Sequence, residues 1–93
     1  MRHLGRNLHK WTEAIIDLPQ DVFTGLPRIT MIGNVQMYIE NHRGVLFFSS
    51  ELLRLALNKG ELQVSGSQLV IRAIGQEEVF LEGSILGFKY IHG

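Results

Sequence analysis

Residues 53–65 read LRLALNKGELQVS, and this stretch decides the fold class. The leucines at positions 53, 55 and 57 lie two residues apart, and Leu62 and Val64 repeat this spacing after the polar segment. A period of two is typical of a strand with one buried face. The intervening Asn58-Lys59-Gly60 is typical of a tight hairpin whose glycine takes a positive φ. The stretch therefore predicts two antiparallel strands joined by a hairpin.

A rival interpretation makes residues 50–58 a helix. Leucine, arginine and alanine are good helix formers, and Ser50 stands where a helix cap would be. The strand is favoured, because the segment is short and runs directly into the hairpin signal.

The same period of two continues on both sides of this hairpin. Apolar residues alternate with others within 35–40, 69–74 and 78–82, and short turn segments separate these stretches at 33–34, 41–44, 49–50, 66–68 and 75–77. Connections this short cannot hold crossover helices, so neighbouring strands should pair antiparallel. We therefore predict a mainly β body over residues 28–91, an antiparallel meander of about six or seven strands, curled or in two layers.

The N-terminal region carries a different period and predicts an amphipathic helix over residues 4–18. Its apolar residues recur at spacings of four and three and share one stripe: Leu4, Leu8, Trp11, Ile15 and Leu18. Pro19 should end this helix. The helix either packs on the sheet, which we favour, or anchors the protein peripherally at a membrane or on a partner.

The composition fits one small domain spanning residues 1–93. Nine basic and nine acidic residues give a formal net charge of zero, which argues against a nucleic-acid partner. The absence of cysteine removes disulfides, thiolate nucleophiles and zinc–thiolate sites. No apolar run reaches the roughly 18 residues of a transmembrane segment, and no signal peptide is recognisable, so we expect a cytoplasmic protein.

No group of residues indicates catalysis, a metal or a cofactor. The four histidines lack the spacing of metal ligands. Glu77, Glu78 and Glu82 favour a solvated strand edge over an acid–base pair. Residues 83–87, GSILG, lack the lysine and helix start of a phosphate loop and predict a bend or bulge. We therefore expect a non-enzymatic protein without a cofactor.

The consecutive phenylalanines Phe47 and Phe48 predict one inward and one outward ring if they lie in a strand. The outward ring would leave apolar surface on the second face of the sheet. Such surface is typical of a second layer or of a partner site.

Several stretches resemble a known family: LPRITMIG at 26–33, YIENHRGV at 38–45, LRL at 53–55, GEL at 60–62, and the acidic residues and LEG within 77–83. On these residues, from Trp11 to Tyr90, the chain is similar to the YabP/YqfC family of sporulation proteins from endospore-forming bacteria. The resemblance implies a non-enzymatic protein made in the mother cell that acts near the forespore envelope, linked to cortex or envelope assembly. It also implies a membrane sporulation protein of the YqfD type as partner, with peripheral association at the outer forespore membrane.

The resemblance implies no catalytic or binding residues. We therefore place the partner site on those residues of the matching stretches that we expect to be exposed. These residues are Arg28, Tyr38, Asn41, His42 and Arg43. We expect an adaptor or scaffold, one route being the addition of a partner strand to a sheet edge. Asn41 has the alternative role of supplying left-handed turn geometry. The alternative functions are a self-assembling homo-oligomer, such as a ring or filament, and, less favoured, a small β module that binds nucleic acid.

Overall fold

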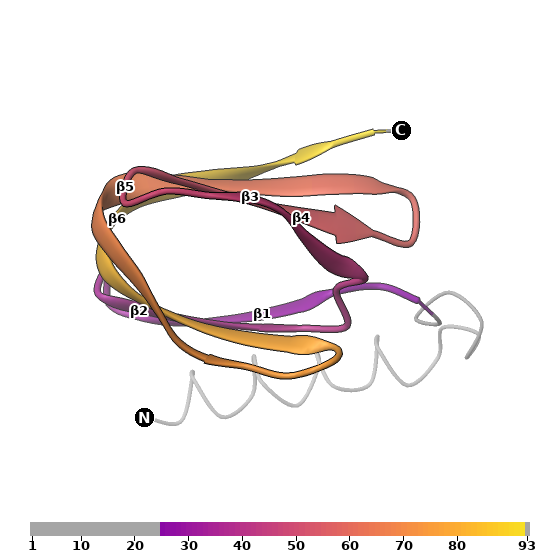
Figure 1. Cartoon of the computed structure of the whole chain (residues 1–93), viewed down its shortest axis with the longest axis horizontal. Helices are drawn as coiled ribbons and strands as arrows, with labels where there is room; N and C mark the ends of the chain where they lie inside the picture. The colour runs from indigo at the N-terminus through magenta and orange to yellow at the C-terminus, as the bar shows by residue number, and fades with distance from the viewer. Residues whose placement is uncertain (1–24, 93) are drawn as a thin grey trace, which may run out of the picture.

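The computed structural model describes residues 25–92, and these form one six-stranded antiparallel sheet (Figure 1). The strands are β1 (Arg28–Ile32), β2 (Gln36–Glu40), β3 (Gly44–Phe48), β4 (Leu52–Leu57), β5 (Gly60–Ile74) and β6 (Glu78–Ile91). The predictions of a mainly β body and of antiparallel pairing are confirmed. The helix predicted over residues 4–18 lies outside the described residues.

The strand order is β1-β2-β6-β5-β4-β3, which departs from a meander at one point. β2 pairs with β6 instead of β3, and residues 41–43 carry the chain across to the far edge of the sheet. The pairing places Met37 opposite Leu81 and Ile39 opposite Val79. All four side chains are fully buried, so this non-local pair contributes apolar contacts to the core.

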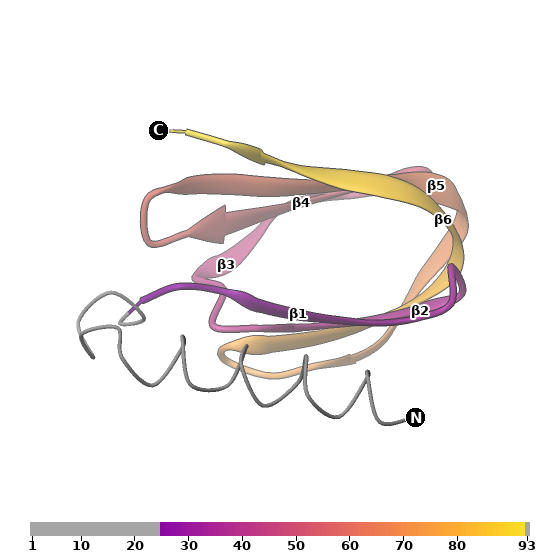
Figure 2. The same cartoon turned by 180° about the vertical axis from the view of Figure 1, so that it is seen from behind.

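β5 and β6 bend in their middle and fold the sheet into two facing layers (Figures 1 and 2). The lower layer contains β1, β2, residues 78–82 of β6 and residues 69–74 of β5. The upper layer contains β3, β4, residues 60–65 of β5 and residues 86–91 of β6. These names follow Figure 1 and are kept below.

The bend passes through residues that the sequence predicted as a turn between separate strands. Residues 66–68 stay within β5 because pairing with β6 continues on both sides of them, with register shifts at the bend itself. An added Cβ on Gly66 would overlap the Ser84 carbonyl oxygen, and Gly83 adopts φ +142°. The prediction of a bend or bulge at residues 83–87 is confirmed. Glycine is needed here because the two backbones approach closely.

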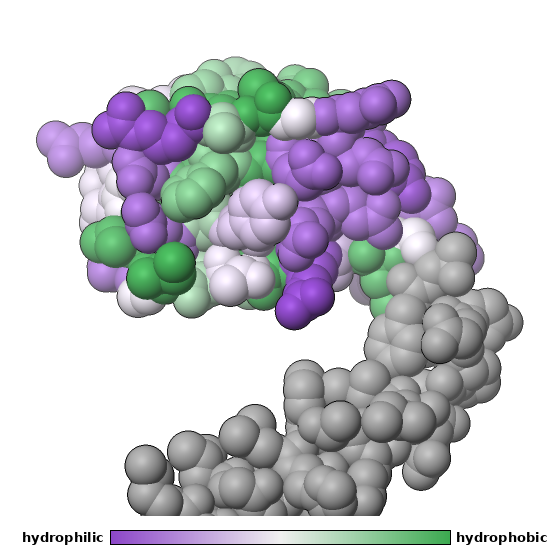
Figure 3. All heavy atoms as spheres, turned by 90° about the horizontal axis from the view of Figure 1, so that it is seen from below, coloured by the Kyte–Doolittle hydropathy of each residue, from purple (hydrophilic) through white to green (hydrophobic). Residues whose placement is uncertain are grey.

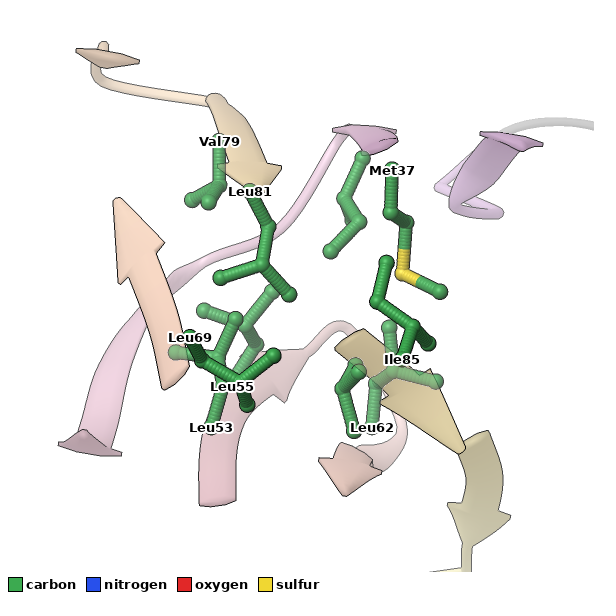
Figure 4. Packing of buried hydrophobic residues seen from close by; sticks show 10 residues of the cluster. Met37, Leu53, Leu55, Leu62, Leu69, Val79, Leu81 and Ile85 are labelled. Atoms are coloured by element: carbon green, nitrogen blue, oxygen red, sulfur yellow. The ribbon is translucent and has the colours of Figure 1, made fainter. Parts of the chain in front are cut away.

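The core fills the space between the two layers (Figure 4). Ten apolar side chains are buried there: Met37, Ile39, Leu53, Leu55, Leu62, Val64, Leu69, Val79, Leu81 and Ile85. They come from β2, β4, β5 and β6, so both layers contribute. Because a chain of this size buries only about 60–70% of its unfolded surface, most of its stability depends on this cluster.

Residues 52–57 form strand β4 and not the rival helix. Leu53 and Leu55 point into the core, whereas Arg54 lies on the outer face and pairs with Gln63. Gly60 follows with φ +104°, as the hairpin prediction requires. The period of two therefore outweighed the helix propensity of leucine, arginine and alanine.

Candidate functional site

The outer face of the lower layer carries an aromatic pair at its centre. Tyr38 on β2 lies opposite Phe80 on β6 and Thr30 on β1. The two ring centroids are 6.2 Å apart with planes inclined by 59°, a favourable tilted geometry. Figure 3 views this layer from outside and shows apolar atoms across the middle of the face with polar atoms on both sides. This outer face thus combines an aromatic pair with apolar surface that polar groups border.

Arg28 and Glu40 lie next to this pair on the same face. They are opposite each other in the β1–β2 ladder, and Arg28 Nε is 3.8 Å from Glu40 Oε2. The Arg28 side chain is 81% exposed. A solvated ion pair of this kind contributes at most about 1 kcal/mol to stability. The guanidinium is therefore available to a partner.

Asn41 and Arg43 form a polar cluster in the connection that follows β2. Asn41 has φ +70°, and its Nδ2 donates to the Leu26 carbonyl oxygen at 2.8 Å. Arg43 Nη1 donates to Asn41 Oδ1 at 2.8 Å and lies 3.8 Å from Glu77 Oε1. The alternative role of Asn41 in left-handed turn geometry is confirmed. Its side chain also holds the Arg43 guanidinium at the surface.

His42 is buried, so the expectation that it lies on the surface with its neighbours is wrong. Its side chain is 2% exposed, and its Nδ1 accepts a hydrogen bond from the Gly44 backbone N–H at 2.9 Å. Its own backbone N–H donates to the Glu77 carbonyl oxygen at 3.1 Å. Nε2 has no hydrogen-bond partner among residues 25–92. His42 ties the connection between the layers to the body of the sheet, and the structure gives it no role in a surface site.

The outer face of the upper layer holds a charged cluster that sequence reasoning missed. Arg54 donates to both carboxylate oxygens of Glu61, from Nε at 2.7 Å and from a terminal nitrogen at 2.9 Å. Gln63 donates to the same carboxylate at 2.9 Å. These hydrogen bonds, that from Arg54 first, lower the pKa of Glu61 to about 2. The register of the β4–β5 hairpin places these side chains on one face, so a prediction of this register would have revealed the cluster.

A second such cluster lies on the lower layer. Arg72 donates to Glu82, which also accepts from Gln36 Nε2 at 2.8 Å. The hydrogen bond from Arg72, followed by that from Gln36, lowers the pKa of Glu82. Glu82 was predicted as part of a solvated edge, but β2 and β5 flank its strand on both sides. Because the Glu82 carboxylate accepts both hydrogen bonds, the cluster fits a structural cross-strand contact better than an acid–base site.

The described residues contain no group of three or more acidic or histidine side chains placed to hold a metal ion. A shallow depression of about 410 Å³ lies on the upper layer, lined by Leu52, Gln63, Ser65, Leu86, Gly87, Phe88 and Lys89. Among these residues, three have polar side chains, namely Gln63, Ser65 and Lys89. Residues 25–92 also include no helix long and apolar enough to cross a membrane.

The structure thus groups four of the five predicted site residues. Arg28 and Tyr38 share the outer face of the lower layer, and Asn41 and Arg43 stand at the end of β2. His42 lies beneath them. The apolar stripe of residues 4–18, from Leu4 to Leu18, lies outside the described residues. We call the grouped residues Arg28, Tyr38, Asn41 and Arg43, with Phe80, the lower-face surface.

Comparisons with known proteins agree with the resemblance in the sequence. The model of the YabP family matches residues 25–93, which include the whole of the β body. The chain is 47% identical over 81 residues to YqfC of Bacillus subtilis (strain 168), a protein described as uncharacterized, and the match covers 87% of each chain. No solved structure matches the chain.

Proposed function

Because the chain belongs to the YabP family, we propose that it is a non-enzymatic sporulation protein that acts as an adaptor or scaffold at the forespore envelope. It works in the mother cell, on the cytoplasmic side, and associates peripherally with the outer forespore membrane. Its partner is a membrane sporulation protein of the YqfD type. Its process is assembly of the spore cortex or envelope.

The observation that carries this proposal is the lower-face surface. An aromatic pair at its centre is bordered by two arginines, and tyrosine and arginine are the residue types that most often dominate binding energy at protein interfaces. Arg28, Tyr38 and Phe80 stand on paired strands, and Asn41 holds Arg43 by a hydrogen bond, so the surface is largely formed before a partner arrives. Such a surface supports docking of another protein more directly than it supports chemistry.

The charges of this surface favour a partner with acidic groups near an apolar contact. Arg28 and Arg43 each have a carboxylate only at 3.8 Å, and although Arg43 Nη1 donates to Asn41 Oδ1, each guanidinium has further donors that a carboxylate of a partner could accept from. Tyr38 offers a hydroxyl beside its ring. A cytoplasmic loop with acidic and apolar residues on a membrane protein would complement this pattern.

The test measures binding of the full chain to a purified YqfD-type membrane protein held in detergent micelles. Tyr38→Ala and Arg43→Ala should each weaken binding by at least about 30-fold, the equivalent of a hot spot near 2 kcal/mol. Tyr38→Phe should retain most of the affinity, because it keeps the ring pair with Phe80. Lys59→Ala, in the hairpin tip of the upper layer, is the control and should bind normally.

A cellular readout accompanies the binding assay. Sporulation efficiency is compared between strains that carry the wild-type chain or a variant in the position of the native YqfC. Loss of both binding and sporulation in Tyr38→Ala and Arg43→Ala supports the proposal. If both variants bind the partner and sporulate as the wild type does, the lower-face surface is not the docking site.

The alternative, a self-assembling structural protein, draws support from a different observation. The two edges of the upper layer are apolar and unpaired in the described chain.

A further inference from the structure

Within residues 25–92, the upper layer ends at both sides in strands whose core side chains stay partly exposed. β3 forms one edge, since among the described strands it pairs only with β4. Residues 86–91 of β6 form the other edge, since they pair with β5 but lie beyond the segment of β6 that pairs with β2. The two edges are of similar length, five and six residues. Both present backbone groups on the side away from their single neighbour.

On the β6 edge, two aromatic rings point toward the interior and yet remain half exposed. Phe88 lies opposite Val64 and Tyr90 opposite Leu62, and directly opposed side chains share a face. Val64 and Leu62 are fully buried, but Phe88 is 42% and Tyr90 is 51% exposed. Their centroids are 6.2 Å apart in an edge-to-face arrangement. The rings belong to the core face, and no described strand pairs with β6 on the side away from β5 at these positions.

The β3 edge also has core-facing side chains that remain partly exposed. Val45 lies opposite Leu55 and Phe48 opposite Leu53, both of which are fully buried. Val45 and Phe48 are themselves each 39% exposed. Phe47 faces outward, opposite Arg54, as the paired phenylalanines predicted. A bulge at Leu46 interrupts the regular spacing of backbone groups along this strand. Pairing with another strand on this edge would therefore depend on side-chain contacts as well as on backbone hydrogen bonds.

Charge distinguishes these two edges from the edges of the lower layer. β3 contains no charged residue, and residues 86–91 contain only Lys89. The lower layer instead has Arg28 on its β1 edge and Arg72 on its β5 edge. Charged side chains are a common means of preventing association at sheet edges. In the part of the chain that the structure describes, charged residues thus protect the edges of the lower layer, whereas the edges of the upper layer have almost none.

Strand direction decides how two copies can meet. The upper layer runs β6-β5-β4-β3, and each neighbouring pair is antiparallel. β3 and β6 therefore run in opposite directions at the two edges. A second copy placed beside the first in the same orientation brings its β6 edge against β3 with antiparallel polarity and with the core faces on the same side.

We infer that copies of this chain associate head to tail, with β3 of one copy pairing with residues 86–91 of β6 in the next. Each contact covers the half-exposed core residues of both edges: Val45, Phe48, Phe88 and Tyr90. Such a heterologous contact leaves one free edge at each end, so it builds a ring if the rotation closes and a filament if it does not. The association uses the upper layer, and it goes beyond the proposed partner docking on the lower layer.

The test uses two variants of the full chain, each with one edge blocked by lysine at exposed apolar positions, and one matched control on the lower layer. The substitutions are Leu46→Lys with Phe47→Lys on β3, Leu86→Lys with Ile91→Lys on β6, and Ile32→Lys with Ile74→Lys as the control. Light scattering after size exclusion gives the mass of each protein over a range of concentrations. Circular dichroism shows whether each variant keeps its β fold.

The expected result has three parts. The wild type and the control exceed the mass of the 10.6 kDa monomer, and the mass rises with concentration. Each edge variant alone is a folded monomer. An equimolar mixture of the two edge variants forms a one-to-one dimer, because each variant retains the edge that the other lacks.

Three results overturn the inference. The wild type stays monomeric at every concentration, either folded edge variant dimerises by itself, or the mixture of folded edge variants stays monomeric. An edge variant that loses its β fold is replaced by one with a single lysine, at Leu46 or Leu86, and the same mixing test applies. Binding to the membrane partner through the lower-face surface should be unaffected in the edge variants, so either idea can fail without the other.

Discussion

Replacing Gly66 by alanine tests whether the bend of β5 and β6 builds the two layers. Gly66 lies opposite Ile85 at a register shift of the β5–β6 ladder. An added Cβ would overlap the Ser84 carbonyl oxygen and lie 3.0 Å from a methyl carbon of Leu69. The carbonyl belongs to the backbone of the facing strand, so relief requires the two strands to separate at the bend.

The magnitude follows from two opposing effects. Forcing an extra methyl into a packed site lowers stability by about 1–3 kcal/mol. We expect a cost near the upper end of this range, because the overlap is with a backbone atom that cannot rotate away. Alanine recovers about 0.4–1 kcal/mol by restricting the unfolded chain. We expect Gly66→Ala to lower the free energy of unfolding by about 2 kcal/mol. For a domain of this size, the melting temperature should fall by roughly 8–16 °C.

Gly87→Ala is the matched control. Gly87 lies opposite Ser65, beside the bend; no heavy atom lies within 4 Å of an added Cβ, and its φ is compatible with alanine. This variant should be as stable as the wild type or slightly more stable. Thermal and urea unfolding followed by far-ultraviolet circular dichroism measure both variants. A Gly66→Ala protein as stable as Gly87→Ala would refute the account of the bend.

Three further predictions concern the core, the charged hairpin and the connection after β2. Leu62→Ala should lower the free energy of unfolding by about 2–5 kcal/mol in urea titrations, because its side chain is fully buried; a loss well below 1 kcal/mol would contradict the core assignment. The lowered pKa of Glu61 adds stability that is present above the ordinary value of 4.5 and is lost as pH falls toward about 2. Between these pH values the melting temperature should therefore fall less steeply in Glu61→Gln than in the wild type, and parallel curves would argue against the Arg54 pair. Asn41→Ala should be less stable than Asn41→Gly in thermal unfolding, because φ is +70° and both variants lose the same side-chain hydrogen bonds; equal stability would show that the backbone there relaxes.

Local patterns in the sequence predicted local structure well. The hairpin within residues 53–65 formed as expected, because its alternation and its turn residues agree with each other over adjacent positions. Non-local pairing was not predictable in the same way. Nothing in the alternation of β2 distinguishes β3 from β6 as its neighbour, because both candidates are apolar.

Glycine and serine runs were ambiguous. Residues 66–68 have the composition of a turn, but the same residue types allow a long strand to bend and continue. The bulge at Arg72 had a similar effect, because the register shift moves Ala73 out of the face that it should share with Leu69 and Ile71. The alternation of apolar and polar residues in a sequence does not show where a bulge adds an extra residue to a strand.

The candidate site was predictable in part. The alternation of β2 puts Tyr38 on the outer face, and the proline before Arg28 begins the strand beside it. The burial of His42 was not predictable, because it depends on a hydrogen bond from the Gly44 backbone N–H and on the hairpin tip at Glu77. Gly44 is close to His42 in the sequence, but Glu77 comes near it only through the unforeseen pairing of β2 with β6.

Photo-crosslinking from position 38 tests the proposed role most directly. Tyr38 is replaced by p-benzoylphenylalanine in the full chain, and sporulating cells that carry it are irradiated. Lys59, in the hairpin tip of the upper layer, receives the same amino acid in a control strain. The account predicts a covalent adduct with a YqfD-type membrane protein from position 38 and none from position 59. No adduct from position 38, or the same adduct from both positions, would contradict it.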